Sequence, residues 1–140
     1  MSCKRKNCIC NSLEKLLKEQ KQLAGESYQF VCNPHGMDTI PFMLTNSHLC
    51  SFRVFGVEEN ECFSTSIFRI EDIESDRCCA SLTLLKAYDM DGCITDCMQD
   101  VYSIKKTDQR IMVDLSCFCI ITPLPPKLVN RPLPIIEPKY

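Results

Sequence analysis

Apolar and polar residues alternate most clearly over residues 111–121, whose sequence is Ile-Met-Val-Asp-Leu-Ser-Cys-Phe-Cys-Ile-Ile. Successive side chains of a strand point to opposite faces, so every second residue from Ile111 to Ile121 shares one face. That face is wholly apolar if Cys117 and Cys119 count as small hydrophobes. The two thiols lie about 7 Å apart on it, too far for a comfortable bond to each other. We therefore predict a central strand over 111–121 in which both cysteines are structural.

Shorter patterns of the same kind predict the other strands. Stretches rich in β-branched and aromatic residues, each bounded by turn residues, cover residues 39–44, 49–57, 66–71, 78–85 and 101–105. Tight connections between antiparallel strands are indicated at Asn46-Ser47, Asp76-Arg77 and Asp91-Gly92. The pattern predicts a mainly β fold, with an antiparallel β-sandwich over residues 28–121.

A helical pattern precedes the strands. Four leucines recur at helical spacing on one stripe: Leu13, Leu16, Leu17 and Leu23. Asn11 is a candidate N-cap, with Glu14 three residues later to complete a capping box, and Gly25 is a typical stop. We predict a short N-terminal helix over residues 11–25.

The two ends of the chain differ in composition from the rest. Residues 1–10 carry three cysteines among basic and polar residues, and we predict a flexible cysteine-containing arm there. From Thr122 onward, six of the last nineteen residues are proline, which has no backbone donor for a strand ladder. Residues 122–140 are therefore predicted to form an extended proline-rich tail, either loose or lying over a neighbour.

Composition narrows the classes of protein. The 140 residues suffice for one domain that folds without covalent help, and the net charge of −2 does not favour a nucleic-acid partner. No apolar run approaches the roughly 18 residues of a membrane span, so we predict no membrane insertion. The N-terminus is basic but no apolar stretch follows it, so we predict synthesis in the cytoplasm without a signal peptide.

Cysteine is the unusual residue, with 12 of 140 positions. A disulfide typically contributes about 2–4 kcal/mol and a whole domain needs only about 5–15 kcal/mol, so six internal bridges would exceed what folding requires. The surplus indicates that some thiols act between chains. The alternative, in which all twelve pair or stay buried within one domain, remains open.

Other uses of cysteine fit the spacing less well. A zinc-binding module would show paired ligands, and only Cys93-x₃-Cys97 and the looser Cys3-x₄-Cys8 approach that spacing. A catalytic cysteine would need a histidine base, and the two histidines, His35 and His48, both lie beside turn residues. No Cys-x-x-Cys, phosphate-binding or dinucleotide motif is present. We predict no enzyme activity, no catalytic residue, no metal and no cofactor, and keep zinc binding as the alternative.

The cysteines divide into two predicted groups. Candidates for cross-links between chains are those of the arm, the vicinal pair and the loop before residue 101: Cys3, Cys8, Cys10, Cys78, Cys79, Cys93 and Cys97. Candidates for structural or intrachain roles are Cys32, Cys50, Cys62, Cys117 and Cys119. Adjacent residues of a strand face opposite ways, so Cys78 and Cys79 are expected to have different partners.

Several segments resemble a known family. Asn7-Cys8-Ile9-Cys10, Asp38-Thr39-Ile40-Pro41-Phe42, Cys78-Cys79-Ala80 and above all Asp114-Leu115-Ser116-Cys117-Phe118-Cys119 are similar to the cysteine-rich spore coat and exosporium family of the CotY, CotZ and ExsY type. The similar pieces cover most of residues 7–121 in family order. Family members often have further cysteines near Arg110 and Pro123, so their disulfide pairings are not transferred, and the proline-rich tail also departs from the family.

The resemblance implies a structural protein of the bacterial spore surface, in the outer coat or crust or in the exosporium. It implies self-assembly into hexagonal two-dimensional sheets hardened by disulfides, with copies of itself and other spore coat proteins as partners. Synthesis in the mother-cell cytoplasm, followed by exposure at the spore surface, would reconcile the cysteine content with the absence of a signal peptide. An adaptor that anchors other coat proteins is a further alternative.

Overall fold

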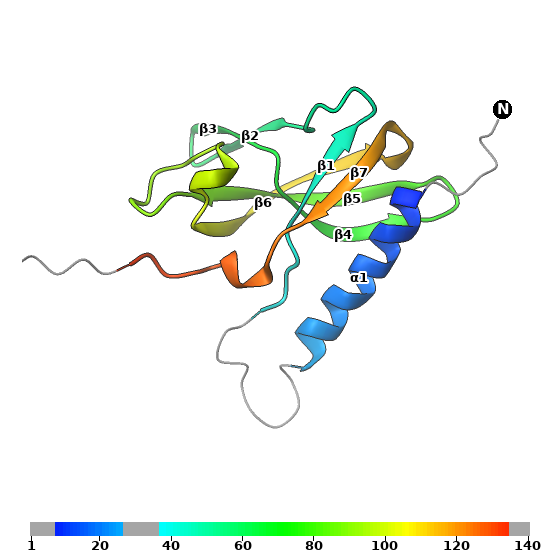
Figure 1. Ribbon diagram of the computed structural model, residues 1–140, viewed down its shortest axis with the longest axis horizontal. Helices are drawn as coiled ribbons and strands as arrows, with labels where there is room; N and C mark the ends of the chain where they lie inside the picture. The colour runs from blue at the N-terminus through cyan, green and yellow to red at the C-terminus, as the bar shows by residue number, and fades with distance from the viewer. Residues whose placement is uncertain (1–7, 27–36, 135–140) are drawn as a thin grey trace, which may run out of the picture.

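The computed structural model describes residues 8–26 and 37–134 (Figure 1). One helix, α1 (Cys8–Glu26), precedes seven strands: β1 (Phe42–Asn46), β2 (Val54–Glu58), β3 (Glu61–Thr65), β4 (Phe68–Glu74), β5 (Cys79–Tyr88), β6 (Ser103–Asp114) and β7 (Phe118–Pro123). Three single-turn 3₁₀ helices complete the described elements: η2 (Met98–Asp100), η3 (Leu115–Cys117) and η4 (Pro126–Leu128). The predicted mainly β fold with an N-terminal helix is confirmed.

The strands form two antiparallel sheets in a sandwich-like arrangement. Five strands follow the order β6-β5-β4-β1-β7, and β2 and β3 form a separate hairpin. The hairpin packs against the large sheet, where Gly56 of β2 leaves room for the Phe63 ring: a Cβ on that glycine would lie 2.5 Å from the ring. The predicted strand over 49–57 contains β2, but its first half is a loop in which Leu49 has a left-handed φ of 63°.

One main core lies between α1 and the large sheet. Its fully buried side chains include Leu13 of the helix, Phe42 of β1, Phe68 of β4 and Leu115 of η3. The Phe68 ring contacts two other rings, with centroid distances of 6.3 Å to Phe42 and 5.4 Å to Phe52. A helix of this length needs such a surface, because most helical stability in proteins comes from the packing of the apolar face.

A polar residue, Gln20, joins the helix to the sheet. It is only 3% exposed; its amide nitrogen donates to the Ile70 carbonyl at 2.9 Å and its amide oxygen accepts from the Ile40 N–H at 3.1 Å. The strands β1 and β4 pair only at Phe42 and Phe68, and in an antiparallel ladder Ile40 and Ile70 would be opposite each other next. The Gln20 amide therefore bridges two backbone groups at the place where the ladder stops.

The helix begins earlier than predicted, at Cys8 rather than Asn11. Ile9 and Cys10 are 4% and 1% exposed, because they extend the apolar stripe of Leu13 by one turn into the core. Asn11 lies inside the helix, so the predicted N-cap is wrong, and so is the flexible arm for residues 8–10. Residues 1–7 lie outside the described part of the chain.

The predicted central strand is broken in two. Residues up to Asp114 belong to β6, η3 follows, and β7 begins at Phe118. The Asp114 carboxylate accepts hydrogen bonds from the Ser116 N–H at 3.0 Å and the Ser116 hydroxyl at 2.6 Å, which closes a turn. The turn changes the alternation, so Phe118 is buried while Cys117 and Cys119 are exposed. The predicted shared apolar face is therefore wrong beyond Leu115.

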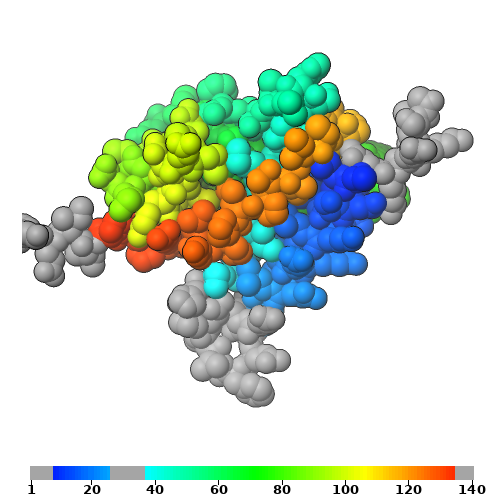
Figure 2. Space-filling view, viewed as in Figure 1, coloured from blue at the N-terminus to red at the C-terminus, as the bar shows by residue number. Residues whose placement is uncertain are grey.

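The first part of the proline-rich tail belongs to the domain. Residues up to Pro123 are in β7, and Leu124 N–H donates to the Pro41 carbonyl at 2.7 Å. Val129 is buried in a second, smaller core cluster and forms a parallel bridge to Ile104 of β6. Figure 2 shows this segment, coloured orange to red, lying against the body of the domain. The expectation of a loose tail, or one lying over a neighbour, is thus wrong for residues 122–131.

Charged side chains on β4 form an ion-pair network. Arg69 Nη1 lies 2.6 Å from Glu71 Oε1, Thr83 donates a hydrogen bond to the same carboxylate, and Arg110 Nη2 lies 3.9 Å from Glu71. Burial alone would raise the pKa of Glu71. The hydrogen bonds from Arg69 and Thr83 and the two guanidinium charges outweigh burial, so the pKa lies below its ordinary value.

This lowered pKa predicts an acid dependence of stability. A carboxyl whose pKa is lower in the folded state contributes stability above its ordinary value of 4.5, and the contribution is lost as the pH falls through the folded value. Glu71→Gln, which does not titrate, is expected to flatten the acid-side fall in the free energy of unfolding, measured by urea unfolding between about pH 3 and 6. Glu74→Gln, an exposed carboxyl on the same strand, is the control; equal flattening in both variants would contradict the prediction.

Candidate cross-linking thiols

Most of the described cysteines are on the surface. Ten cysteines lie in the described residues, all of them free, and seven are exposed: Cys8, Cys50, Cys62, Cys93, Cys97, Cys117 and Cys119. Free cysteine is normally among the most buried residue types, because its thiol behaves as a small hydrophobe. This distribution is the reverse of what a domain using cysteine for its core would have. Cys3, Cys32 and His35 lie outside the described residues.

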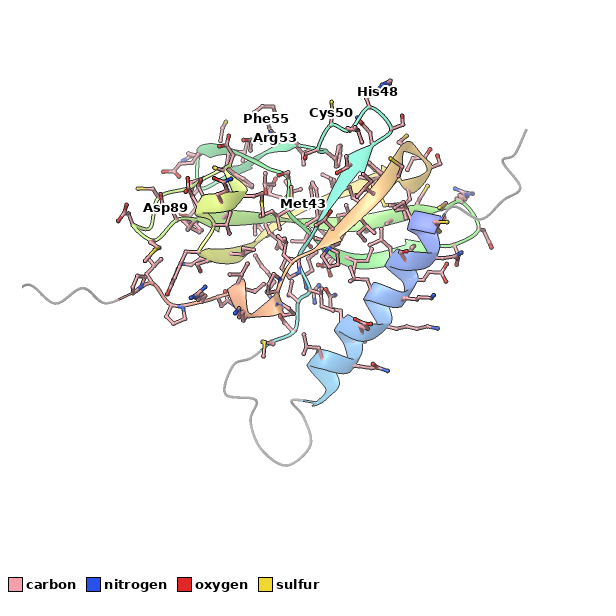
Figure 3. All side chains as sticks on the ribbon, in the orientation of Figure 1. Met43, His48, Cys50, Arg53, Phe55 and Asp89 are labelled. Atoms are coloured by element: carbon pink, nitrogen blue, oxygen red, sulfur yellow. The ribbon has the colours of Figure 1, made fainter. Side chains whose placement is uncertain are left out.

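Three of the exposed thiols gather where β1 ends; we call Cys50, Cys117 and Cys119 the β1-end thiols. Asn46, the last residue of β1, organises the site: its side-chain oxygen accepts from the Cys50 N–H at 3.0 Å, and its carbonyl oxygen lies 3.3 Å from Cys119 Sγ. The ladder between β1 and β7 is irregular between Thr45 and Asn46, and Cys119 is the residue left without a partner there. Figure 3 shows Cys50 and His48 projecting from the loop after β1.

Cys50 and Cys119 are not placed to bond with each other across β1. Thr45 pairs with Ile120 of β7 on one side of the strand and with Ser51 on the other. Cys119 and Cys50 are the neighbours of those two partners, so they lie about two strand spacings, or roughly 10 Å, apart. A disulfide requires Cα atoms within about 7 Å. Cys50 and Cys119 are therefore each open to a partner outside their own chain.

A second pair of exposed thiols, Cys93 and Cys97, lies in the loop between β5 and η2. The Asp89 carboxylate accepts from the Cys93 N–H at 2.9 Å, and the Thr95 hydroxyl accepts from the Cys97 N–H at 3.1 Å. An ion pair of 3.0 Å between Asp96 and Arg53 ties this loop to the segment before β2. The side-chain hydrogen bonds hold the backbone and leave both thiols toward solvent.

The β2–β3 hairpin carries a thiol beside an apolar surface. Val57 pairs with Cys62, and Phe55 pairs with Ser64, so these four side chains share the outer face of the hairpin. Phe55 is 79% exposed and Val57 is 55% exposed. Phe55 lies along the same edge of the molecule as Cys50 (Figure 3). Exposed apolar side chains gathered in this way are typical of a surface that contacts another protein.

The remaining described cysteines are inside or half-buried. Cys10 is 1% exposed and faces the core, while Cys78, at the end of the turn before β5, and Cys79, the first residue of β5, are half-buried. Burial raises the pKa of the Cys78 thiol, and the neighbouring Cys10 thiol and the Asp114 carboxylate raise it further, to about 12. Cys78 is therefore protonated at neutral pH and reacts slowly, because the thiolate is the reactive form.

The described part of the chain contains no assembled metal site. Among residues 8–26 and 37–134, no three side chains of histidine, cysteine, aspartate or glutamate are grouped so as to hold a metal ion. Cys93 and Cys97, the pair with zinc-like spacing, thus have no third ligand within these ranges. Over the same residues, no helix is both long enough and apolar enough to cross a membrane.

The sequence pattern predicts structural or intrachain roles for Cys50, Cys62, Cys117 and Cys119, and the structure places all four on the surface. For Cys117 and Cys119, a signal was present: Asp114 followed by Ser116 is a pair that closes a turn through the aspartate side chain. For Cys10, the prediction of an accessible arm residue is wrong, because the helix extends past it.

Fold and thiols define a class: a small, mainly β protein that carries unpaired cysteines on its surface. The chain belongs to the spore coat protein Z family, whose model matches residues 1–126. It is 32% identical, over 146 aligned positions, to the spore coat protein Z of Bacillus subtilis (strain 168), and the alignment covers 94% of this chain and 97% of that protein. No solved structure matches the chain. The predicted family is thereby confirmed.

Proposed function

We propose that this protein is a structural subunit of the bacterial spore coat, which assembles with copies of itself into a sheet held by disulfides between chains. Membership of the spore coat protein Z family supports the spore coat role. The observation that carries the cross-linking is the set of seven exposed, unpaired thiols among the residues that the structure describes. The protein would be made in the mother-cell cytoplasm, where thiols stay reduced, and would oxidise at the spore surface, in the coat, crust or exosporium.

The chemistry needs no catalytic group in this chain. A thiol on one subunit and a thiol on the next lose two protons and two electrons together and form one S–S bond. A small-molecule disulfide accepts the electrons and the protons and is released as two thiols. The role of this protein is to place its thiols at the surface, so we expect no enzyme activity.

Apolar contact would bring subunits together before the bonds form. Phe55 and Val57 supply that surface on the outer face of the hairpin, and Cys62 lies beside them. Burying apolar area gives roughly 25 cal/mol per Å², which is enough for weak, reversible association that the disulfide then makes permanent. Hexagonal packing, and contacts with other spore coat proteins, are parts of the proposal that the family resemblance suggests.

The proposal revises the roles of individual cysteines. The β1-end thiols and Cys62 join Cys8, Cys93 and Cys97 as candidates for bonds between chains, because all are exposed. Half-buried Cys79 stays a candidate, and Cys3 stays one outside the described residues. Cys10 leaves the group, since a thiol that is 1% exposed does not meet another chain without unfolding of the helix.

The first test uses gels of the purified full chain after reduction and then oxidation by a small-molecule disulfide. We expect a ladder of multimers on non-reducing gels that collapses to the monomer when a reductant is added. Replacing the β1-end thiols by serine removes three of the seven thiols exposed among the described residues, so about half of the cross-linked material is expected to remain. Densitometry of the ladder gives the measurement.

Ser47→Ala with Ser51→Ala is the matched control, because these residues flank Cys50 and carry no sulfur. This double variant is expected to keep the full ladder. Electron microscopy of the oxidised wild type tests the sheet directly. A protein that stays monomeric after oxidation, or that binds stoichiometric zinc and then resists oxidation, would overturn the proposal.

A further inference from the structure

Two of the cysteines that remain after the surface thiols are set aside face each other. Cys10 lies in the first turns of α1 and belongs to the main core. Cys78 is the last residue of the turn between β4 and β5, and it packs against the same core cluster from the side of the sheet. Within this cluster the Cys10 thiol is a close neighbour of the Cys78 thiol and acts on its ionisation. Two thiols about half the chain length apart in sequence are thus neighbours between the helix and the sheet.

The backbone of Cys78 is unusual for a residue with a side chain. Its φ is 56°, in the left-handed region, where glycine or asparagine is normally preferred and other residues are strained. The carbonyl of Cys78 accepts from the Leu115 N–H at 2.8 Å, which fixes this conformation against η3. The chain therefore places a cysteine at a position that favours glycine, and its thiol meets Cys10.

We propose that Cys10 and Cys78 are an oxidisable pair that closes to a disulfide within one chain and joins α1 covalently to the β4–β5 turn. In the reaction, the half-buried Cys78 thiol displaces half of a small-molecule disulfide and forms a mixed disulfide. The other thiol then displaces the remaining half. The protein gains one S–S bond, the reagent leaves as two thiols, and electrons and protons balance.

This pairing goes beyond the proposed function, because a bond within one chain does not link subunits. The pairing also assigns different roles to cysteines that are close in sequence, Cys8 and Cys10 on the helix and Cys78 and Cys79 at the turn. Cys8 is exposed two positions before Cys10, and the Cys79 thiol lies 3.7 Å from the Arg77 carbonyl rather than against the helix. Cys10 and Cys78 would therefore pair with each other, while Cys8 and Cys79 would stay free or meet other chains.

The test maps the bond in the full chain at high dilution, where bonds between chains are disfavoured. The reduced protein is oxidised with a small-molecule disulfide, quenched in acid, unfolded and alkylated, so that slowly reacting thiols are also captured. Digestion without reductant, followed by tandem mass spectrometry, is expected to yield a linked peptide that carries Cys10 and Cys78. Each monomer with the link should carry two fewer alkyl groups than the reduced protein.

Four single variants supply matched pairs. Cys10→Ser and Cys78→Ser are expected to lose the linked peptide, whereas Cys8→Ser and Cys79→Ser are expected to keep it. Circular dichroism checks that each variant is folded, and the wild-type map decides the question even if Cys10→Ser is not. Absence of the link in wild-type monomer, or linkage of Cys78 to a different cysteine as the main product, would overturn the pairing.

The outcome is independent of cross-linking between chains. The double variant Cys10→Ser with Cys78→Ser is expected to form the same ladder of multimers as the wild type, because every exposed thiol is retained. A ladder without the internal link would leave the proposed function intact and remove this inference. The link without a ladder would do the opposite.

Discussion

Phe68→Ala is expected to lower the free energy of unfolding by about 3–5 kcal/mol, because it opens a cavity at the centre of the main core. Phe68 is fully buried, and its ring contacts those of Phe42 and Phe52. These rings connect β4 to β1 and to the segment before β2, so the loss is spread over three parts of the fold. Urea unfolding in the presence of a reductant measures it without interference from disulfides.

Phe55→Ala makes the same chemical change at a ring that is 79% exposed. It is expected to change the free energy of unfolding by no more than about 0.5 kcal/mol, as surface substitutions usually do. If the two variants lost equal stability, the assignment of core and surface on the two strands would be wrong. Phe55→Ala is also expected to weaken multimer formation, since it removes apolar surface beside Cys62.

Gln20→Leu is expected to cost about 2–5 kcal/mol although it replaces a polar residue by an apolar one of similar size. The substitution leaves the Ile40 N–H and the Ile70 carbonyl buried without the partner that Gln20 provides, and each orphaned group costs about 1–3 kcal/mol. Urea unfolding gives the change, and faster hydrogen exchange at the Ile40 amide would report the lost bond directly.

Gln22→Leu is the control for this substitution, since Gln22 is exposed on the same helix. It is expected to leave the free energy of unfolding within about 0.5 kcal/mol of the wild type. A stabilising effect of Gln20→Leu would mean that apolar packing outweighs the two hydrogen bonds, and that the bridge between β1 and β4 is dispensable.

The periodicity of apolar residues predicted which helices and strands exist better than it predicted the residues at which they begin and end. The leucine stripe with Leu13 and Leu16 predicted the helix, and alternation predicted β4, which buries one face. The strand β5 is buried on both faces over most of its length, and its apolar run predicted it. The hairpin strand β3 was missed as a separate element because it is short and only Phe63 and Thr65 face inward. Gln20 was missed because its role depends on where a distant ladder stops, which no local pattern records.

The positions of the thiols were the hardest part to predict. Cys117 and Cys119 continue the apolar alternation of β6, but the turn at Asp114 ends that strand. The alternation of side chains within one strand does not extend through the turn, so it does not predict which way these two thiols point. Cys50 lies in a loop whose shape depends on Asn46. The contact of Cys10 with Cys78 is long-range and follows from how the helix crosses the sheet, so spacing along the chain could not predict it.

The scattering of the exposed sulfurs has a geometric consequence. A subunit that can form bonds at only two places yields linear chains, whereas a subunit with three or more such places can form a branched network. Within residues 8–26 and 37–134, the exposed thiols occupy four separate places: the start of α1, the end of β1, the β2–β3 hairpin and the loop before η2. In the proposed sheet, the loss of one disulfide would therefore not release a subunit, because its bonds at the other places would still hold it in the network.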